Sequence, residues 1–363
     1  MVRGPPLAPC PGGRMTPLGE RIVALIGANG PISVADYMAL CLFDPEHGYY
    51  TTREPFGTAG DFTTAPEISQ MFGELCAAWL AHGWQAMGSP SEVALVEIGP
   101  GRGTLAIDMV RTLTQVAPRL SRKLHLVEAS ERLRDVQRKR LKAASVDAEW
   151  HETIDTLPEA PLLIVANELF DAIPARQFVA LGHRWMERSV TVRNGALAFG
   201  AGTATLSDQR SAPNGTVRET APAREAMMAA IAGRLVRHDG LLLTFDYGHE
   251  GGDGDTLQAI KDHAPVDPLA FPGESDLTTH VDFAALARAA AAAGAHVPPS
   301  LTQGEFLVKS GLVERAGALG AGRSQEEQDA IRAAVERLAG PAAMGRTFRA
   351  LAVSGRPRSL PPF

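Results

Sequence analysis

The sequence predicts an α/β protein: a doubly wound, Rossmann-like sheet whose strands are mostly parallel. From residue 93 onward, short apolar runs alternate with segments in which apolar residues recur at helical spacing. Such alternation requires crossover connections, which build a parallel sheet with helices on both faces. The chain has 363 residues, 45% of them hydrophobic and 21% charged, which is enough to bury a large core.

The first 90 residues are expected to be mainly helical. Residues 1–16 are rich in Pro and Gly and predict a disordered tail. Residues 17–43 carry apolar residues at helical spacing, interrupted by the turn signal GANGP. Residues 44–67 predict an irregular but ordered loop, and residues 68–88 an amphipathic helix that ends at glycine. Residues 17–90 therefore form a predicted helical N-terminal region.

An α/β domain is predicted over residues 91–355, followed by a short tail at 356–363. Its expected strands are 93–98, 123–128, 148–152, 161–167 and 241–248, and its expected helices 103–117, 130–144 and 222–237. An insertion of about 175–220 separates the fourth strand from the fifth. Its first part alternates polar and apolar residues as antiparallel strands do.

Composition and targeting signals favour a cytoplasmic protein. The net charge of −6, without a basic block, argues against general nucleic-acid binding. No apolar run approaches the roughly 20 residues that cross a bilayer. The N-terminus lacks a secretory apolar core, and its Pro and Gly oppose a mitochondrial transit helix. Cys10, Cys41 and Cys76 lack metal-ligand spacing and favour a reduced compartment.

A glycine-rich turn follows the first predicted strand of the α/β domain. Gly99, Gly101 and Gly103 come just after Glu97 and open the next predicted helix. Glycine tolerates positive φ and leaves no Cβ to block a ligand, while a helix N-terminus offers free N–H groups. A dinucleotide fingerprint, G-x-G-x-x-G, needs a glycine at position 104, where this sequence has Thr104.

These departures favour S-adenosyl-L-methionine as the ligand of the turn. Backbone N–H groups suit its carboxylate, and Glu97 suits its ammonium group. Glu128 ends the second predicted strand, where an acid accepts hydrogen bonds from ribose hydroxyls. The alternative is a turn that only connects strand to helix, with Glu128 a solvated strand end. Trp150, in the third strand, is expected either to contact adenine or to pack in the core.

Six motifs together are far more specific than the turn alone, and through them residues 17–353 resemble the MidA-type methyltransferases. The motifs are GDFTTAPEISQMFGE (60–74), VEIGPGRGTL (96–105), ANELFDAIP (166–174), DYGH (246–249), DLTTHVDF (276–283) and MGRTFRALAV (344–353). The resemblance implies a class I methyltransferase sheet with a helical N-terminal extension and S-adenosyl-L-methionine as cofactor. Its mitochondrial members imply symmetric dimethylation of arginine on a subunit of respiratory complex I, the NADH dehydrogenase. The missing transit peptide favours a bacterial member.

The resemblance also implies that the loop carrying Asp61 and Phe62 closes over the donor, with Asp61 as a polar contact and Phe62 as an apolar lid. The alternative is a loop that packs against the N-terminal helices, with Glu67 opening the following helix near its positive end.

Polar residues after the fourth strand predict an acceptor site. An arginine guanidinium is always charged, and carboxylates pair with it in bidentate fashion. Asn167, Glu168 and Asp171 follow the strand near the edge where open α/β sheets bind ligands. A helical turn would place Glu168 and Asp171 on one face. We predict that this pair clamps the guanidinium and that Asn167 shapes the methyl site; the alternative is a polar strand end with Asp171 capping the next segment.

Asp246, Tyr247 and His249 end the fifth strand and are predicted to line the acceptor channel. His263 and His280, with His249, have nearby acids, but their irregular spacing predicts no metal site.

Three classes of function fit these observations. The first is an S-adenosyl-L-methionine-dependent protein arginine methyltransferase with a protein substrate. The second is a catalytically silent assembly chaperone that keeps the donor site for stability, because function resides in sites and not in folds. The third, a nicotinamide-dependent oxidoreductase, is disfavoured by the glycine spacing. A small-molecule methyltransferase is a further alternative. The target protein, the number of methyl groups and the oligomeric state are not fixed by the sequence.

Overall fold

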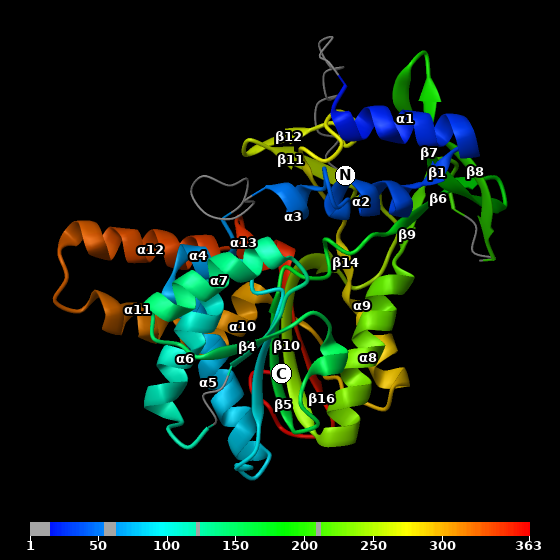
Figure 1. Cartoon of the computed structure of the whole chain (residues 1–363). Coiled ribbons are helices and arrows are strands. Elements are labelled where there is room, and N and C mark those ends of the chain that lie inside the picture. The colour runs from blue at the N-terminus through cyan, green and yellow to red at the C-terminus, as the bar shows by residue number, and fades with distance from the viewer. Residues whose placement is uncertain (1–14, 54–62, 121–123, 208–211) are drawn as a thin grey trace. The chain divides into compact units, whose positions relative to one another are not determined.

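A computed structural model describes residues 15–53, 63–120, 124–207 and 212–363 (Figure 1). The chain forms two compact units, each assembled from three separate stretches. The first unit comprises residues 1–62, 171–224 and 252–280, and the second comprises 63–170, 225–251 and 281–363. Cutting the chain into consecutive segments does not reproduce these units, because each unit is held together by contacts between stretches that are distant in the sequence.

The second unit contains the predicted doubly wound sheet. Its strands are β2 (Ala94–Ile98), β3 (Leu124–Val127), β4 (Ala148–His151), β5 (Leu162–Asn167), β10 (Gly240–His249), β15 (Leu301–Thr302) and β16 (Phe348–Ser354), with β14 (Val281–Asp282) beside β10. Their order is β15-β16-β10-β5-β2-β3-β4, parallel from β10 to β4 and antiparallel at β16. Strands β2, β3 and β5 are buried along their whole length and mostly apolar, because both faces of the sheet are covered. The mostly parallel α/β fold is thus confirmed.

The strand order reverses beside β2. From β2 the chain moves outward to β3 and β4, then returns to β5 on the other side of β2. The connections that leave β2 and β5 therefore diverge, and ligands of open α/β sheets bind at the crevice formed by such a divergence.

Helices cover both faces of this sheet, with α5 and α6 on one side and α8 and α9 on the other (Figure 1). They are α4 (Ala65–Ile68), α5 (Gln70–Ala86), α6 (Thr104–Val116), α7 (Glu131–Ala143), α8 (Pro222–His238), α9 (Phe283–Ala292), α10 (Gln303–Lys309), α11 (Leu312–Gly320), α12 (Gln325–Ala339) and α13 (Met344–Thr347), with a 3-10 turn, η1, at Ile154–Thr156. The helices predicted from periodicity are confirmed within a few residues. Ser130 caps α7 as expected, because its hydroxyl accepts the Leu133 N–H at 3.4 Å.

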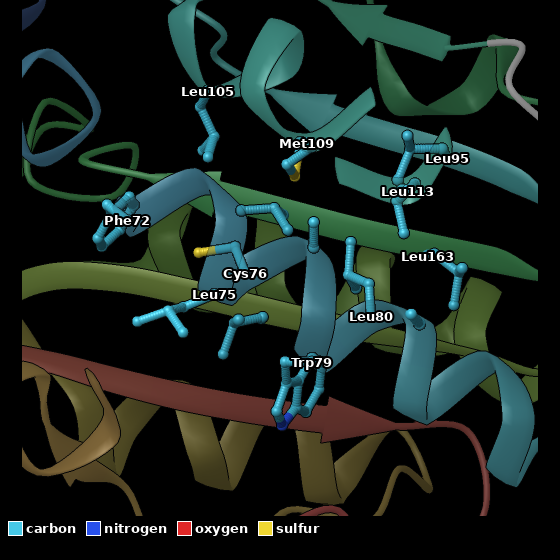
Figure 2. Close-up of a cluster of buried hydrophobic side chains, with 14 of the residues drawn as sticks. Phe72, Leu75, Cys76, Trp79, Leu80, Leu95, Leu105, Met109, Leu113 and Leu163 are labelled. Carbon is cyan, nitrogen blue, oxygen red and sulfur yellow. The ribbon is translucent and has the colours of Figure 1, made fainter. Parts of the chain in front are cut away.

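The core of the second unit lies between α5, α6 and the sheet (Figure 2). Phe72 of α5 is fully buried, and its ring meets that of Phe245 edge-on with centroids 4.9 Å apart. Leu105 and Met109 on α6 face the same layer. The apolar spacing that predicted these helices is therefore the spacing of the face that each one buries.

The first unit holds the N-terminal helices and the inserted antiparallel strands. Its helices are α1 (Pro17–Asn29), α2 (Val34–Phe43) and α3 (Tyr49–Thr52), and its strands β1 (Ile32–Ser33), β6 (Arg176–Leu181), β7 (Arg184–Arg193), β8 (Ala196–Leu206), β9 (Val217–Thr220), β11 (Gln258–Lys261), β12 (Ala264–Val266) and β13 (Asp276–Thr278). One sheet has the order β1-β7-β6-β9 with β8 beside β7, and every pairing is antiparallel. The antiparallel insertion is confirmed.

Among the described residues, no helix is both long and apolar enough to span a membrane.

Replacing Phe72 by alanine should lower the free energy of unfolding by about 3–5 kcal/mol, because it leaves a cavity in the layer between α5 and the sheet. Urea unfolding followed by tryptophan fluorescence measures the change. Val116 is 52% exposed on α6 of the same unit, so Val116→Ala should leave the urea midpoint almost unchanged. Equal midpoints for the two variants would contradict this account of the core.

Candidate functional site

The glycine turn lies at the C-terminal end of β2, as predicted. Gly99, Gly101 and Gly103 have φ of 69°, 52° and 77°, a left-handed region that favours glycine. The Gly99 N–H donates to Val127 O at 3.0 Å, which ties the turn to β3. Gly103 is the N-cap of α6 and provides no side-chain cap, so the N–H groups of Thr104 and Leu105 donate no hydrogen bond to it.

Glu97 is buried beneath this turn and is 3% exposed. Burial raises the pKa of its carboxyl well above the usual value, while a hydrogen bond from the Ala106 N–H acts in the opposite direction. Its Oε2 is buried and has no hydrogen-bond partner among the described residues. An unpartnered carboxylate oxygen of this kind is complementary to an ammonium group, so the residue fits the donor's amino end.

Glu128 follows β3 and is not a freely solvated strand end. Its Oε1 accepts the Ser130 N–H at 2.8 Å, and its Oε2 accepts the Gln137 amide at 3.2 Å. Burial raises its pKa, and the hydrogen bonds from Ser130 and Gln137 oppose that rise. Trp150 on β4 packs against the core, which was one of its two predicted roles.

Glu67, on α4, reaches the start of α6, a contact that the sequence did not reveal. The Thr104 hydroxyl donates to its carboxylate, and the Arg102 and Arg140 guanidinium groups lie 3.8 and 3.7 Å away. Glu67 and Thr104 are 37 positions apart in the sequence, and no local pattern pairs them. Asp61 and Phe62, predicted to contact the donor, lie outside the described residues.

Asn167 and Glu168 stand at the end of β5, next to the glycine turn. Glu168 has a φ of 51°, and its N–H donates to Phe245 O at 2.9 Å. The Asn167 amide donates to Glu168 Oε1 at 2.9 Å. Asn167 Oδ1 is buried and has no hydrogen-bond partner in the described part of the chain.

Asp171, three residues after Glu168, begins the second stretch of the first unit. Residues 168–173 form bends and a turn, so this segment has no helical turn that would place the two carboxylates on one face. The left-handed backbone of Glu168 explains the difference, because it diverts the chain as soon as β5 ends. Asp171 is 6% exposed, and its Oδ1 accepts the Ala172 N–H at 2.8 Å.

The three residues predicted to line the acceptor channel differ in their surroundings. Asp246 is fully buried, and its two oxygens accept the N–H groups of Phe170 at 2.9 Å and Tyr247 at 3.1 Å. It therefore holds the segment after β5 in place. Tyr247 is half-buried against Phe348, and His249 Nδ1 accepts the Gly251 N–H at 3.1 Å. A substrate contact by any of the three stays a prediction.

A histidine pair that the sequence did not single out lies on β3 and β4. In the described part of the chain, His125, Glu149 and His151 form a group whose ligand atoms lie within 4.8 Å of one another. His125 Nδ1 is 2.9 Å from His151 Nε2, and His151 Nδ1 is 3.0 Å from Thr156 Oγ1. Mutual hydrogen bonds are the ordinary way to satisfy two buried imidazoles.

Residues 75–300 match a family model described as "Putative S-adenosyl-L-methionine-dependent methyltransferase". The chain is 35% identical over 93% of its length, and 84% of the relative, to the mitochondrial protein arginine methyltransferase NDUFAF7 homolog of Drosophila melanogaster. The protein arginine methyltransferase NDUFAF7 of Rattus norvegicus, also mitochondrial, is 33% identical over 95% of the chain and 86% of the relative.

A solved structure from Burkholderia thailandensis, with S-adenosyl-homocysteine bound, superposes with a TM-score of 0.83. The two chains are 28% identical, and the match covers 94% of this chain and 93% of the other. A second structure from that organism superposes with a TM-score of 0.80 at the same identity.

The raised pKa of Glu97 predicts how stability depends on pH. The folded protein retains a proton on Glu97 at pH values where the unfolded chain has lost it. The contribution of Glu97 to the free energy of unfolding therefore falls as the pH rises from 4.5 through the folded-state pKa. The amide side chain introduced by Glu97→Gln cannot ionise. Its Tm should therefore match the wild type near pH 4 and increasingly exceed it toward about pH 8, measured without donor.

The same variant should bind S-adenosyl-homocysteine more weakly, because the ligand's ammonium loses its counter-charge. Calorimetric titration at about pH 7.5 measures this affinity. A variant that is less stable than the wild type at every pH, and binds equally well, would show that Glu97 is only a packed core residue.

Proposed function

The chain belongs to the family of S-adenosyl-L-methionine-dependent methyltransferases, and we propose that its acceptor is an arginine side chain of a protein. It is an enzyme with S-adenosyl-L-methionine as cofactor. The names of the curated relatives support arginine as acceptor. The observation that carries the proposal is a glutamate, Glu168, held at the end of the strand that neighbours the donor turn.

The strand register brings this glutamate beside the donor turn. Ala166 of β5 pairs with Ile98 of β2, so the residues that follow each strand leave the sheet together. Leu169 Cδ1 lies 3.1 Å from the position that a Cβ on Gly99 would take. Methyl transfer from a sulfonium is a direct displacement, and the enzyme's task is to align nucleophile, methyl and sulfur. The closeness of this segment to the turn supports a role for Glu168 in that alignment.

A guanidinium needs acceptors that orient it, because it is planar and permanently charged. Glu168 supplies a carboxylate, and Asn167 adds the unpartnered Oδ1 described above. We propose that Glu168 and Asp171 clamp the guanidinium and that Asn167 shapes the methyl site. The clamp does not need a helical turn, since two carboxylates from a bent segment also suit a planar fork.

A subunit of respiratory complex I, symmetrically dimethylated during assembly, is the protein substrate that we propose. The motif resemblance supports this choice, and the names of the mitochondrial relatives support arginine methylation. We propose the bacterial cytoplasm as the site of action.

The test measures transfer of labelled methyl groups from S-adenosyl-L-methionine to proteins of an extract and membranes from a strain that lacks the gene. Hydrolysis of a labelled band should yield dimethylarginine. Glu168→Gln and Asp171→Asn should each lower the rate about 10- to 100-fold, because each removes a charged hydrogen bond to the guanidinium. Donor affinity should stay near the wild type.

Glu314→Gln is the matched control, because Glu314 is an exposed acid on α11. Unchanged rates for both site variants would overturn the clamp. Tight donor binding with no labelled protein or small molecule would instead favour the assembly chaperone, and a labelled small molecule would favour a small-molecule methyltransferase.

A further inference from the structure

We propose that Gln137 is a positioning residue of the donor site, because its one amide joins the glycine turn, Glu128 and the indole of Trp150. Gln137 lies on α7 and is fully buried. Its Nε2 donates to Gly101 O in the glycine turn at 2.8 Å and to Glu128 Oε2 after β3 at 3.2 Å. Its Oε1 accepts the Trp150 indole N–H of β4 at 2.9 Å. No local sequence pattern marks it.

The orientation of this amide is dictated by its partners. An indole N–H can only donate, so Trp150 must face the Gln137 oxygen. The two N–H groups of the amide must then point to Gly101 O and to the Glu128 carboxylate, which only accept. In a flipped amide, the N–H groups of Gln137 would face the Trp150 N–H, and the oxygen would face Gly101 O and the Glu128 carboxylate. Neither contact is a hydrogen bond. The side chain is thus locked in one state, as a positioning group requires.

The glycine turn needs such a support. It contains three glycines with left-handed φ, and glycine has the largest conformational freedom of any residue. Gly101 C=O and the Arg102 N–H belong to one planar peptide and point in opposite directions. By holding the carbonyl, Gln137 fixes the Arg102 N–H on the other side of the turn. A backbone donor for the ligand's carboxylate is thereby aimed before the ligand arrives.

The same amide also sets the rotamer of Glu128. With Oε1 bound to the Ser130 N–H and Oε2 to Gln137, the carboxylate is fixed at both oxygens. A carboxylate has about four acceptor positions, so others remain for ribose hydroxyls. Gln137 therefore couples the part of the site that receives the amino-acid end of the donor to the part that receives its ribose.

Gln137→Met tests this role, because methionine has a similar length and volume but makes no comparable hydrogen bonds. We expect its Kd for S-adenosyl-homocysteine to rise about tenfold or more, measured by calorimetry on the full chain. The inference rests on the donor site alone, so it can hold or fail whatever the methyl acceptor proves to be.

Gln303→Met is the matched control. Gln303 is also fully buried in the second unit, and its Nε2 donates to Leu338 O at 2.8 Å on α12. A similar loss of Tm is expected for both variants, but donor affinity should change only for Gln137→Met. Equal affinities of Gln137→Met and the wild type, with a lowered Tm, would show a purely structural role.

Coupling is tested with Glu128→Gln. If Gln137 acts through Glu128, the Kd of the double variant for S-adenosyl-homocysteine should rise by less than the product of the two single fold-changes. Strict additivity would overturn the coupling. Gln137→Glu keeps the acceptor for Trp150 but turns an oxygen toward Gly101 O and Glu128, so we expect it to bind worst of all.

Trp150→Phe provides an independent check should Gln137→Met not fold. It removes the indole N–H that fixes the amide's orientation while leaving Gln137 in place. Donor affinity should fall, and an unchanged Kd would contradict the proposed lock.

Discussion

The arrangement of the site depends on the pairing of β2 with β5 at the point where the strand order reverses. Both strands are buried on two faces, and their parallel register brings Ile98 opposite Ala166. The donor turn leaves one strand, and the acidic segment leaves the next. Because the strands are fixed by ladder hydrogen bonds and by the core beneath α5 and α6, the two loops begin from a rigid edge.

The residue predicted to bind the donor's ammonium group, Glu97, lowers the stability of the folded protein. Glu97 occupies a buried position between the sheet and α6, where an apolar residue would be more stable. Its raised pKa expresses that cost, since burial disfavours the charged form. In the predicted role of Glu97, the ammonium group of the bound donor would offset this cost. The buried oxygen of Asn167, which has no partner among the described residues, would have a similar cost at the proposed acceptor site. Such local penalties are typical of functional sites.

Periodicity predicted the fold well because each buried face repeats along its own helix or strand. The sheet, the main helices, the Ser130 cap and the antiparallel insertion all depend on local patterns. The contacts of Gln137 and of Glu67 with the glycine turn were not predictable, since they join residues 36 or 37 positions apart. The bent backbone at Glu168 was equally unpredictable, because no local pattern marks the left-handed residue that diverts the chain. The interleaving of two units is equally non-local.

The boundary between the units falls between Phe170 and Asp171, within the predicted acceptor segment. On one side, Asp246 of the second unit holds the Phe170 N–H. On the other, Arg224 of the first unit, 2% exposed, donates to Asp171 O at 3.0 Å and to Ile173 O at 2.9 Å. Each half of the segment is thus anchored within its own unit. The residues that follow β2 belong wholly to the second unit. The glycine turn and its supports therefore lie within one unit, whereas the predicted acceptor segment is divided between the two.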